Sequence, residues 1–399
     1  MDSAEREGLR PKGNVPNLRF PEFHGEWEKT KFGDIATGFD YGMNAAAKNY
    51  DGVNKYIRIT DIDEASSTYK DKDIVSPDGV LADNYLVNNR DILLARTGAS
   101  TGKSYLYKKS DGKLYYAGFL IRANVTTHDP YFVFSQLHTH RYWRWVSIMS
   151  ARSGQPGINS QEYSSFPIYT TSIEEESKIA KLLSLLDERI ATQNKIIEDL
   201  KKLKSAIIEI EYTPNTKTTS HIGNVIEQIS KRNKNNAIQN VLSVSNRQGF
   251  IKQSDQFENR NVASEDTSNY KIVEKNDFAF NPARINVGSI ARLTTFEKGI
   301  VSPMYVCFRT QENVAPEYID YFFESKHFYC EIQKRLEGSV RQCLSFEGLC
   351  NIPFSLPSLE MQQRIGKRLF TLGQKIKTET DLLELLNKQK QYLLRQMFI

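Results

Sequence analysis

SIEEESKIAKLLSLLDERIATQNKIIEDLKKLKSAIIEIEY, residues 172–212, contains neither glycine nor proline. Ser172 is a suitable helix N-cap, and three glutamates follow it in the first turn, where the helix dipole favours anions. Apolar residues recur at alternating steps of three and four, which is the spacing of a coiled-coil seam. The segment therefore predicts one long helix of about 40 residues, roughly 60 Å in length, which needs a partner along its seam.

The same pattern returns in residues 358–398, where Ser358 again precedes a long apolar periodicity. Polar residues interrupt the first seam at Gln193 and Lys204 and the second at the equivalent Glu379 and Lys390. The predicted seam residues are Leu183, Leu186, Ile190, Ile197, Leu200 and Ile207 in the first helix, and Leu369, Leu372, Ile376, Leu383, Leu386 and Leu393 in the second.

The repetition extends beyond the helices, because many residues recur 186 positions later without a gap. Pairs with this offset are Asp91 and Asp277, Gly102 and Gly288, Pro130 and Pro316, Ser153 and Ser339, Pro167 and Pro353, and Ser172 and Ser358. A register of this length indicates a tandem duplication, in which each copy is a globular part followed by a long helix. The helices match well between the copies, whereas the globular loops match only at turn residues.

The simplest partner for each helix is the other helix. The first helix carries nine acidic and seven basic residues, the second four acidic and eight basic, and opposite net charges favour pairing between unlike helices. Because each helix ends one repeat, we expect an antiparallel pair. The alternative is that each helix packs separately on its own domain.

The globular parts combine short β-rich segments, such as residues 55–59 and 304–308, with turn-rich loops. The predicted fold class is α+β: a tandem duplication of two α/β domains joined by two long helices that form an antiparallel coiled coil. The predicted division is a flexible N-terminal tail (1–17), a first domain (18–171), a first helix (172–212), a second domain (213–357) and a second helix (358–399).

Composition excludes several classes of protein. No apolar run is long enough to cross a membrane, and the polar N-terminal residues do not resemble a secretion signal. The four cysteines contain no C-x-x-C pair, which argues against a zinc site and a disulfide framework, so we expect no metal and a cytoplasmic location. The net charge of +5 is too small to indicate a nucleic-acid partner by itself.

Two segments resemble catalytic motifs but lack their essential spacing. Residues 98–104 (GASTGKS) have three residues between the glycines, whereas a phosphate-binding P-loop needs four. Residues 280–283 (FNPA) resemble the start of the Asn-Pro-Pro-aromatic motif of amino-group DNA methyltransferases but lack the second proline and the aromatic residue. We therefore expect neither an ATP site nor catalysis. The first segment is better interpreted as a polar turn that contacts phosphates or base edges, with an ordinary solvated turn as the alternative.

Polar loops at matching places in both copies are the candidate functional residues. Residues 152–159 (RSGQPGIN) align with residues 338–345 (GSVRQCLS), and Arg, Gln and Asn side chains can form paired hydrogen bonds to guanine or adenine edges. The candidate DNA-contacting residues are Arg58, Arg96, Thr97, Ser100, Thr101, Lys103, Ser104, Arg152, Gln155 and Asn159 in the first copy, and Asn246, Arg247, Arg284, Asn286, Ser289, Arg341, Gln342 and Ser345 in the second.

Several local sequences stand out: LRFPEF (18–23), Glu26-Trp27, SGQ (153–155), FPI (166–168) and LDERI (186–190). Together with the architecture, they resemble the specificity subunit of type I restriction–modification systems. The resemblance covers nearly the whole chain after the N-terminal tail. The helix start differs in the second copy, where Met361, Gln362 and Gln363 replace two glutamates and a serine.

This resemblance implies that each globular part is a target-recognition domain for one half of a bipartite, gapped, asymmetric duplex DNA target. It implies that the helices set the gap and dock two modification subunits, which methylate adenine N6. S-adenosylmethionine, ATP and Mg are expected in the modification and restriction subunits, and no cofactor in this chain. The alternative is a non-enzymatic coiled-coil adaptor whose two domains bind proteins.

Overall fold

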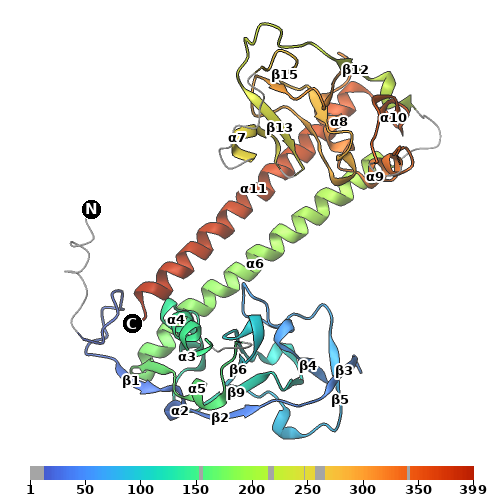
Figure 1. The fold of residues 1–399 in the computed structure, drawn as a ribbon. Helices are drawn as coiled ribbons and strands as arrows, with labels where there is room; N and C mark the ends of the chain where they lie inside the picture. Colours follow the sequence, from blue (N-terminus) through green and yellow to red (C-terminus); the bar gives the residue numbers. More distant parts are fainter. Residues whose placement is uncertain (1–12, 152–155, 214–219, 247, 257–265, 339–341) are drawn as a thin grey trace. The chain divides into compact units, whose positions relative to one another are not determined.

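The computed structural model describes residues 13–151, 156–213, 220–246, 248–256, 266–338 and 342–399 (Figure 1). The predicted tail lies mostly outside this part of the chain. The chain forms two compact units: residues 1–195 with 381–399, and residues 196–380. Each unit thus contains one globular domain, part of α6 (Ile173–Tyr212) and part of α11 (Leu359–Gln396). Within the described residues, no helix is both long and apolar enough to span a membrane.

The first domain is built on a four-stranded antiparallel sheet covered by helices. Across this sheet the strands are β2 (Ala36–Tyr41), β9 (Leu120–Val125), β6 (Asp91–Ala95) and β7 (Ser104–Leu106). The helices are α2 (Phe32–Ile35), α3 (Pro130–Gln136), α4 (His140–Met149) and α5 (Ser160–Ser164), and β1 (Glu28–Lys31) pairs with β10 (Pro167–Thr170). Two further strand pairs join β3 (Ala46–Asn49) to β5 (Val75–Asp78) and β4 (Lys55–Ile57) to β8 (Leu114–Tyr116).

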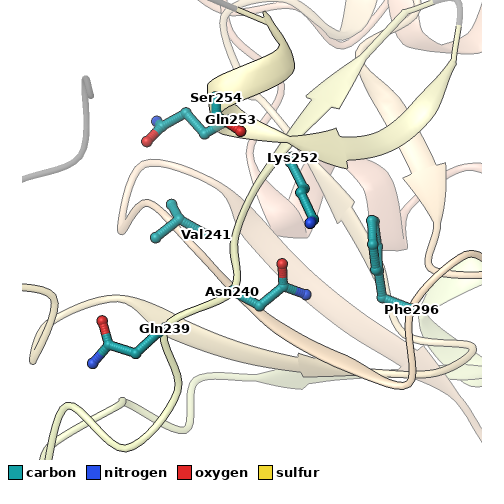
Figure 2. Close-up of a pocket in the computed structure, with 7 residues that line it drawn as sticks. All are labelled: Gln239, Asn240, Val241, Lys252, Gln253, Ser254 and Phe296. Carbon is teal, nitrogen blue, oxygen red and sulfur yellow. The ribbon is translucent and has the colours of Figure 1, made fainter. Parts of the chain in front are cut away.

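The second domain repeats this plan with a larger second sheet. Its first sheet has the order β12 (Ile226–Ile229), β19 (Val306–Thr310), β16 (Phe278–Phe280) and β17 (Ile290–Arg292). The second has the order β14 (Gly249–Lys252), β13 (Val241–Ser245), β18 (Lys298–Val301) and β15 (Lys271–Glu274), and Figure 2 shows residues beside it. The remaining elements are α7 (Gln253–Gln256), α8 (Pro316–Phe322), α9 (Lys326–Gln333), α10 (Phe346–Cys350), β11 (Ser220–His221) and β20 (Pro353–Phe354).

The structure extends the constant offset between the copies into the sheets. Helices α3 and α8 begin at Pro130 and Pro316, and α5 and α10 begin at residues 160 and 346. The parallel strand pairing is also preserved, because β4 pairs with β8 in the first domain as β13 pairs with β18 in the second. The copies diverge in the segment that follows: residues 58–84 return through β5 to β3, whereas the equivalent segment of copy two contains β14 and α7.

Each domain core includes the end of the long helix from the other repeat. In the first unit, Phe398 packs against Trp27 and Phe132, with ring centroids 6.1 and 5.3 Å away. In the second unit, Tyr212 packs against Tyr318 at 4.8 Å and donates a hydrogen bond to its carbonyl oxygen. Tyr212 and Phe398 occupy equivalent positions in the two repeats, so the two helices close the two cores in the same way.

Contacts inside each unit show that the two helices run antiparallel, as predicted. In the first unit the Lys390 ammonium lies 2.6 Å from the Asp187 carboxylate, and in the second Arg368 lies 3.8 Å from Glu211. Lys204, which interrupts the predicted seam, pairs at 2.6 Å with Glu324 of the second domain. Of the predicted seam residues, the buried ones are Leu183, Leu186, Ile197, Ile207, Leu369 and Leu386, and the partly exposed ones are Ile190, Leu200, Leu372, Ile376, Leu383 and Leu393.

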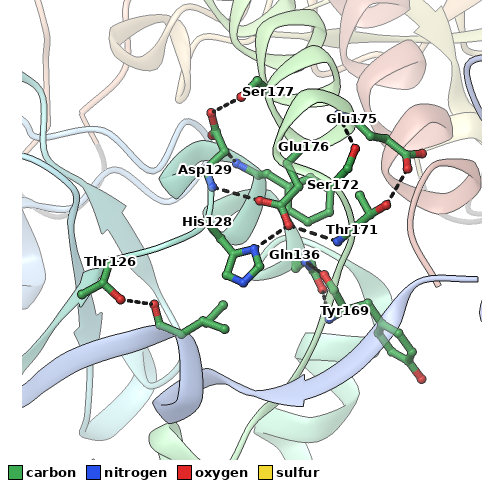
Figure 3. A network of polar contacts seen from close by, with 12 residues as sticks. Thr126, His128, Asp129, Gln136, Tyr169, Thr171, Ser172, Glu175, Glu176 and Ser177 are labelled. Carbon is green, nitrogen blue, oxygen red and sulfur yellow. Dashed lines mark hydrogen bonds and ion pairs between the residues drawn. The ribbon is translucent and has the colours of Figure 1, made fainter. Parts of the chain in front are cut away.

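The start of α6 is anchored by two buried glutamates (Figure 3). Glu175 accepts two hydrogen bonds from the Arg19 guanidinium, both 2.7 Å long. Glu176 accepts hydrogen bonds from the backbone N–H groups of Asp129 (2.9 Å) and Thr171 (3.1 Å). These carboxylates therefore do more than complement the helix dipole, because they tie α6 to three other segments of the first domain.

In copy two an amide replaces the carboxylate of Glu176, and a difference in the backbone explains the change. Gln362 occupies the position equivalent to Glu176, and its Oε1 accepts from the Ala315 N–H at 2.9 Å. The residue equivalent to Thr171 is Pro357, which has no N–H to donate. The Gln362 amide instead donates to the Pro357 carbonyl oxygen at 2.9 Å. The sequence difference at the second helix start thus preserves the anchor.

His128 couples this anchor to pH. Its Nδ1 lies 2.8 Å from Glu176 Oε1, and this hydrogen bond, above all, raises the pKa of His128 above its ordinary value of 6.5. Because the folded pKa is the higher one, the interaction contributes fully below about pH 6.5 and is lost as pH rises through the raised pKa. We expect the difference in unfolding free energy between the wild type and His128→Gln to shrink over that interval.

Hydrogen exchange of first-unit amides at several pH values measures this difference. Subtracting the variant cancels the contributions of other groups, such as His138, whose pKa burial lowers to about 4. A difference that is constant across the interval would contradict the proposed ion pair.

Candidate nucleic-acid interface

In the first domain, the structure brings together two loops that the sequence predicts as functional. The backbone of Ile158 donates to the Arg96 carbonyl oxygen, and Gly98 donates to that of Pro156, each at 2.9 Å. Thr97 and Gly157 form an isolated β-bridge. The turn at 96–104, between β6 and β7, therefore lies directly beside residues 156–159.

The second domain repeats this arrangement. Leu344 donates to the Pro282 carbonyl oxygen at 3.0 Å, and these residues are the equivalents of Ile158 and Arg96. Gly102 and Gly288, also equivalent, both have a positive φ (93° and 88°), which glycine adopts without strain. The turn is therefore part of the duplicated framework.

Two buried aspartates lie at the start of the strands that lead into these turns. Asp91 accepts hydrogen bonds from the Asn88 N–H (2.7 Å) and the Asn124 side chain (2.6 Å). Its equivalent, Asp277, accepts from the Glu274 N–H (2.8 Å) and from Arg309 (3.0 Å). Burial raises the pKa of both carboxyl groups. Each aspartate thus fixes the beginning of the strand that leads into the candidate turn.

Three candidates of the first turn, Arg96, Ser100 and Lys103, are partly exposed. The Arg96 guanidinium lies over the ring of Tyr41, 4.6 Å from its centroid, and Tyr41 is 43% exposed. Lys103 lies 3.5 Å from the exposed carboxylate of Glu64, an ion pair that water screens. Arg96 with Tyr41 offers a cation and an aromatic face together, a combination that sequence reasoning missed because the two residues lie far apart along the chain.

Other candidates have structural partners. Arg58 is held by Asp61 through two hydrogen bonds of 2.8 Å. Asn159 caps α5 by accepting from the Glu162 N–H at 2.9 Å, and its equivalent Ser345 caps α10 by accepting from Gly348 at 3.0 Å. The buried candidates are Thr101, Ser104 and Ser289. The remaining described candidates are Thr97 and Asn286, which are half-buried, and Gln342, which is exposed.

The second domain adds a polar cavity of about 100 Å³. Its lining includes Asn246 at the end of β13, and Arg284 and Ser289 from the turn between β16 and β17. Asn246 and Arg284 are exposed, while the Ser289 hydroxyl donates to the Val244 carbonyl oxygen at 3.2 Å. The structure thus joins three candidates that lie far apart in the sequence. The candidates Arg152, Gln155, Arg247 and Arg341 lie outside the described residues.

A larger cavity of about 630 Å³ lies beside the second sheet (Figure 2). Figure 2 shows the Asn240 amide and the Lys252 ammonium pointing into the same space, next to the ring of Phe296. None of these residues was predicted from the sequence. The sequence signal for a functional surface in this region is the run Lys231-Arg232-Asn233-Lys234, because three cations in four residues form a local basic patch.

In the part of the chain that the structure describes, no group of three or more His, Cys, Asp or Glu side chains is arranged to hold a metal ion. The fold and these surfaces define a duplicated α/β protein that displays polar and basic loops on a shared frame. Comparison with known proteins shows to which family this protein belongs. The chain belongs to the family of type I restriction modification DNA specificity domains, whose model matches residues 24–202 and 207–388.

Named relatives agree with this assignment. The chain is 24% identical over 412 residues to the type I restriction enzyme MjaVIII specificity subunit of Methanocaldococcus jannaschii, covering 94% of this chain and 90% of the relative. It is 25% identical over 301 residues to the putative MjaX specificity subunit of the same organism, covering 69% and 67%.

Solved structures share the fold. The S subunit of a type I restriction–modification system from M. genitalium matches with a TM-score of 0.62 and 14% identity over 96% of this chain and 99% of that chain. A chain from a structure on the assembly and conformational transition of the type I system matches with a TM-score of 0.52 and 14% identity, over 93% and 97%.

Proposed function

We propose that each globular domain recognises one half of a bipartite, gapped, asymmetric duplex DNA target. The observation that carries this proposal is the pattern of divergence between the copies. Strand pairs, turns and helix starts are preserved at a constant offset, whereas residues 58–84 and their equivalents in copy two differ in secondary structure. A shared frame with two different surfaces suits recognition of two different half-sites.

We propose further that the paired helices fix the gap and dock two adenine-N6 methyltransferase subunits. In α6, the side chains of Ile196, Leu203 and Ile210 follow one another at heptad spacing, which places them on one helix face. All three are exposed, Ile210 at 76%, and an apolar row in water marks a surface that suits a protein partner. Restriction subunits would join the same complex.

In this proposal the chain acts in the cytoplasm and performs no catalysis. The modification and restriction subunits bind S-adenosylmethionine, ATP and Mg, and this chain determines where they act. The proposal is tested by methylation-sensitive long-read sequencing of DNA from a methylation-free host that expresses the modification subunit with or without this chain. N6-methyladenine is expected at a two-part gapped motif only when this chain and its modification subunit are expressed together. Identical methylation with the modification subunit alone would favour the adaptor instead.

Arg284 is expected to specify bases in one half-site. Arg284→Ala removes an exposed guanidinium from the polar cavity, and a lost paired contact to a base costs about 1–3 kcal/mol. We expect methylation to become less selective in the half-site of the second domain alone. Arg96→Ala is the matched control, because it should relax only the other half-site. If Arg284→Ala weakens methylation equally at all sequences, Arg284 contacts phosphate instead.

A further inference from the structure

The segment that connects β12 to β13 has an unusual charge. Residues 230–240 contain Lys231, Arg232 and Lys234 and no acidic residue. The equivalent residues of the first copy, 44–54, contain one lysine and one aspartate. That lysine, Lys48, lies 3.7 Å from the Asp78 carboxylate. The two domains therefore differ in charge at one place on a common frame.

The segment is held in a defined shape by a buried asparagine. Asn233 is 2% exposed, and its amide both donates to the Ile238 carbonyl oxygen (2.9 Å) and accepts from the Ile238 N–H (3.1 Å). The Asn233 backbone N–H donates to the Tyr270 carbonyl oxygen, and the Lys231 carbonyl oxygen accepts from the Ile272 N–H at 2.8 Å. The intervening residues thus form a braced loop, and the cationic side chains on either side of Asn233 point outward from a fixed backbone.

The carboxylates around the segment are engaged mainly by other groups: the pKa of Glu274 is lowered above all by Lys298, and more weakly by Arg309 and Lys231. Glu274 pairs with Lys298 at 2.9 Å, and Asp266 accepts from the Ser268 N–H at 2.8 Å. Among the described residues, Lys231 and Lys234 have no carboxylate within ion-pair distance and are exposed. Arg232 donates to the Asn269 side chain at 3.2 Å, which occupies only one of its N–H groups. Positive charge is therefore available to a ligand.

Residues of this segment also line two hollows of the surface. One, of about 820 Å³, is lined by the three cations of the loop together with Lys298. The other is the cavity of Figure 2, where Asn240 and Lys252 point inward. A row of cations beside an amide-rich cavity matches a DNA strand, whose phosphates lie at its edge and whose bases lie further in.

We propose that residues 230–240 form a phosphate-contacting surface through which the second domain binds the DNA backbone irrespective of sequence, and that the first domain lacks its counterpart. This inference rests on the proposed function. It adds that the two domains contribute unequally: the second supplies more of the salt-dependent affinity. Contacts to phosphate position a protein on the duplex without adding base selectivity.

The test uses the complete chain assembled with its modification subunit. Binding of a duplex that carries the methylation motif and of a scrambled duplex is measured at several salt concentrations. Each phosphate contact contributes about 0.9 to the slope of log K against log salt. Lys231→Gln with Lys234→Gln is therefore expected to reduce that slope by about two on both duplexes. Affinity should fall by a similar factor for both, with the methylation motif unchanged.

Two controls make the outcome decisive. Lys48→Gln removes the residue equivalent to Lys234 and should leave the slope unchanged, while the double arginine variant should retain it, because arginine keeps the charge. An unchanged slope in the double glutamine variant, or a loss confined to the motif-bearing duplex, would overturn the inference while leaving the proposed function intact. If the wild-type complex shows neither a motif nor salt-dependent binding, the proposed function itself fails, and the inference with it.

Discussion

Glu176→Ala is expected to lower the unfolding free energy of the first unit by about 3–5 kcal/mol, the typical cost of breaking a buried ion pair. The Glu176 side chain is fully buried, and it accepts from two backbone N–H groups and from His128. The alanine variant leaves these donors inside the domain without an acceptor. Hydrogen exchange of amides in α3 and the start of α6 would report the loss.

Gln362→Ala is the matched control, because Gln362 anchors the equivalent helix start without a charge, accepting from Ala315 and donating to Pro357. Its loss should cost less, about 1–3 kcal/mol, and should appear in the second unit. Glu176→Gln should fall between wild type and alanine, since the amide can still accept from Asp129 but cannot accept from Thr171 and His128 as a carboxylate does. Equal effects of the two alanine variants would show that the charge of Glu176 is unimportant.

Phe398→Ala is expected to destabilise the first unit by about 3–5 kcal/mol, the usual cost of truncating a buried aromatic residue. Phe398 is 6% exposed and lies between Trp27 and Phe132, so its removal leaves a cavity that rigid neighbours cannot fill. Proteolysis or hydrogen exchange should show faster opening of the first domain, although the substitution and Trp27 lie near opposite ends of the sequence.

Tyr212→Ala should do the same to the second domain, where Tyr212 packs on Tyr318 and Phe322. The pair of variants distinguishes local from general destabilisation. If each variant weakens only the unit that contains it, the two helix ends serve separate cores. If Phe398→Ala left the first unit unchanged, the end of α11 would not be part of that core.

The helices and the duplication could be predicted because their signals are local or constant. A repeating apolar pattern, interrupted at a few polar positions, defines α6 over 40 residues and α11 over 38 residues, and a fixed offset links the copies without knowledge of contacts. The order of the strands in the sheets could not be predicted, because the strands are only two to six residues long and several pairs, such as β2 with β9, join distant parts of the chain. The parallel pairing of Lys55–Ile57 with Leu114–Tyr116 has no sequence signature of its own.

The candidate site was predicted only in part, because polar residues in loops serve several purposes. Asn159 and Ser345 occupy equivalent places, and the structure gives both a capping role. Residue type alone does not separate a cap from a base contact, since both use a side-chain oxygen. The turn at 96–104 was found through its composition, but its neighbour Tyr41 required the fold.

The way in which the chain is divided between the two units has a consequence for folding during synthesis on the ribosome. The second unit is one continuous segment, residues 196–380, whereas the first requires residues 381–399. Its core cannot close until the last helical turns leave the exit tunnel, although its own sheet is made first. The core of the first domain therefore stays incomplete, with the surface around Trp27 uncovered, while the second domain folds. Chaperone binding during translation should concentrate on that first domain.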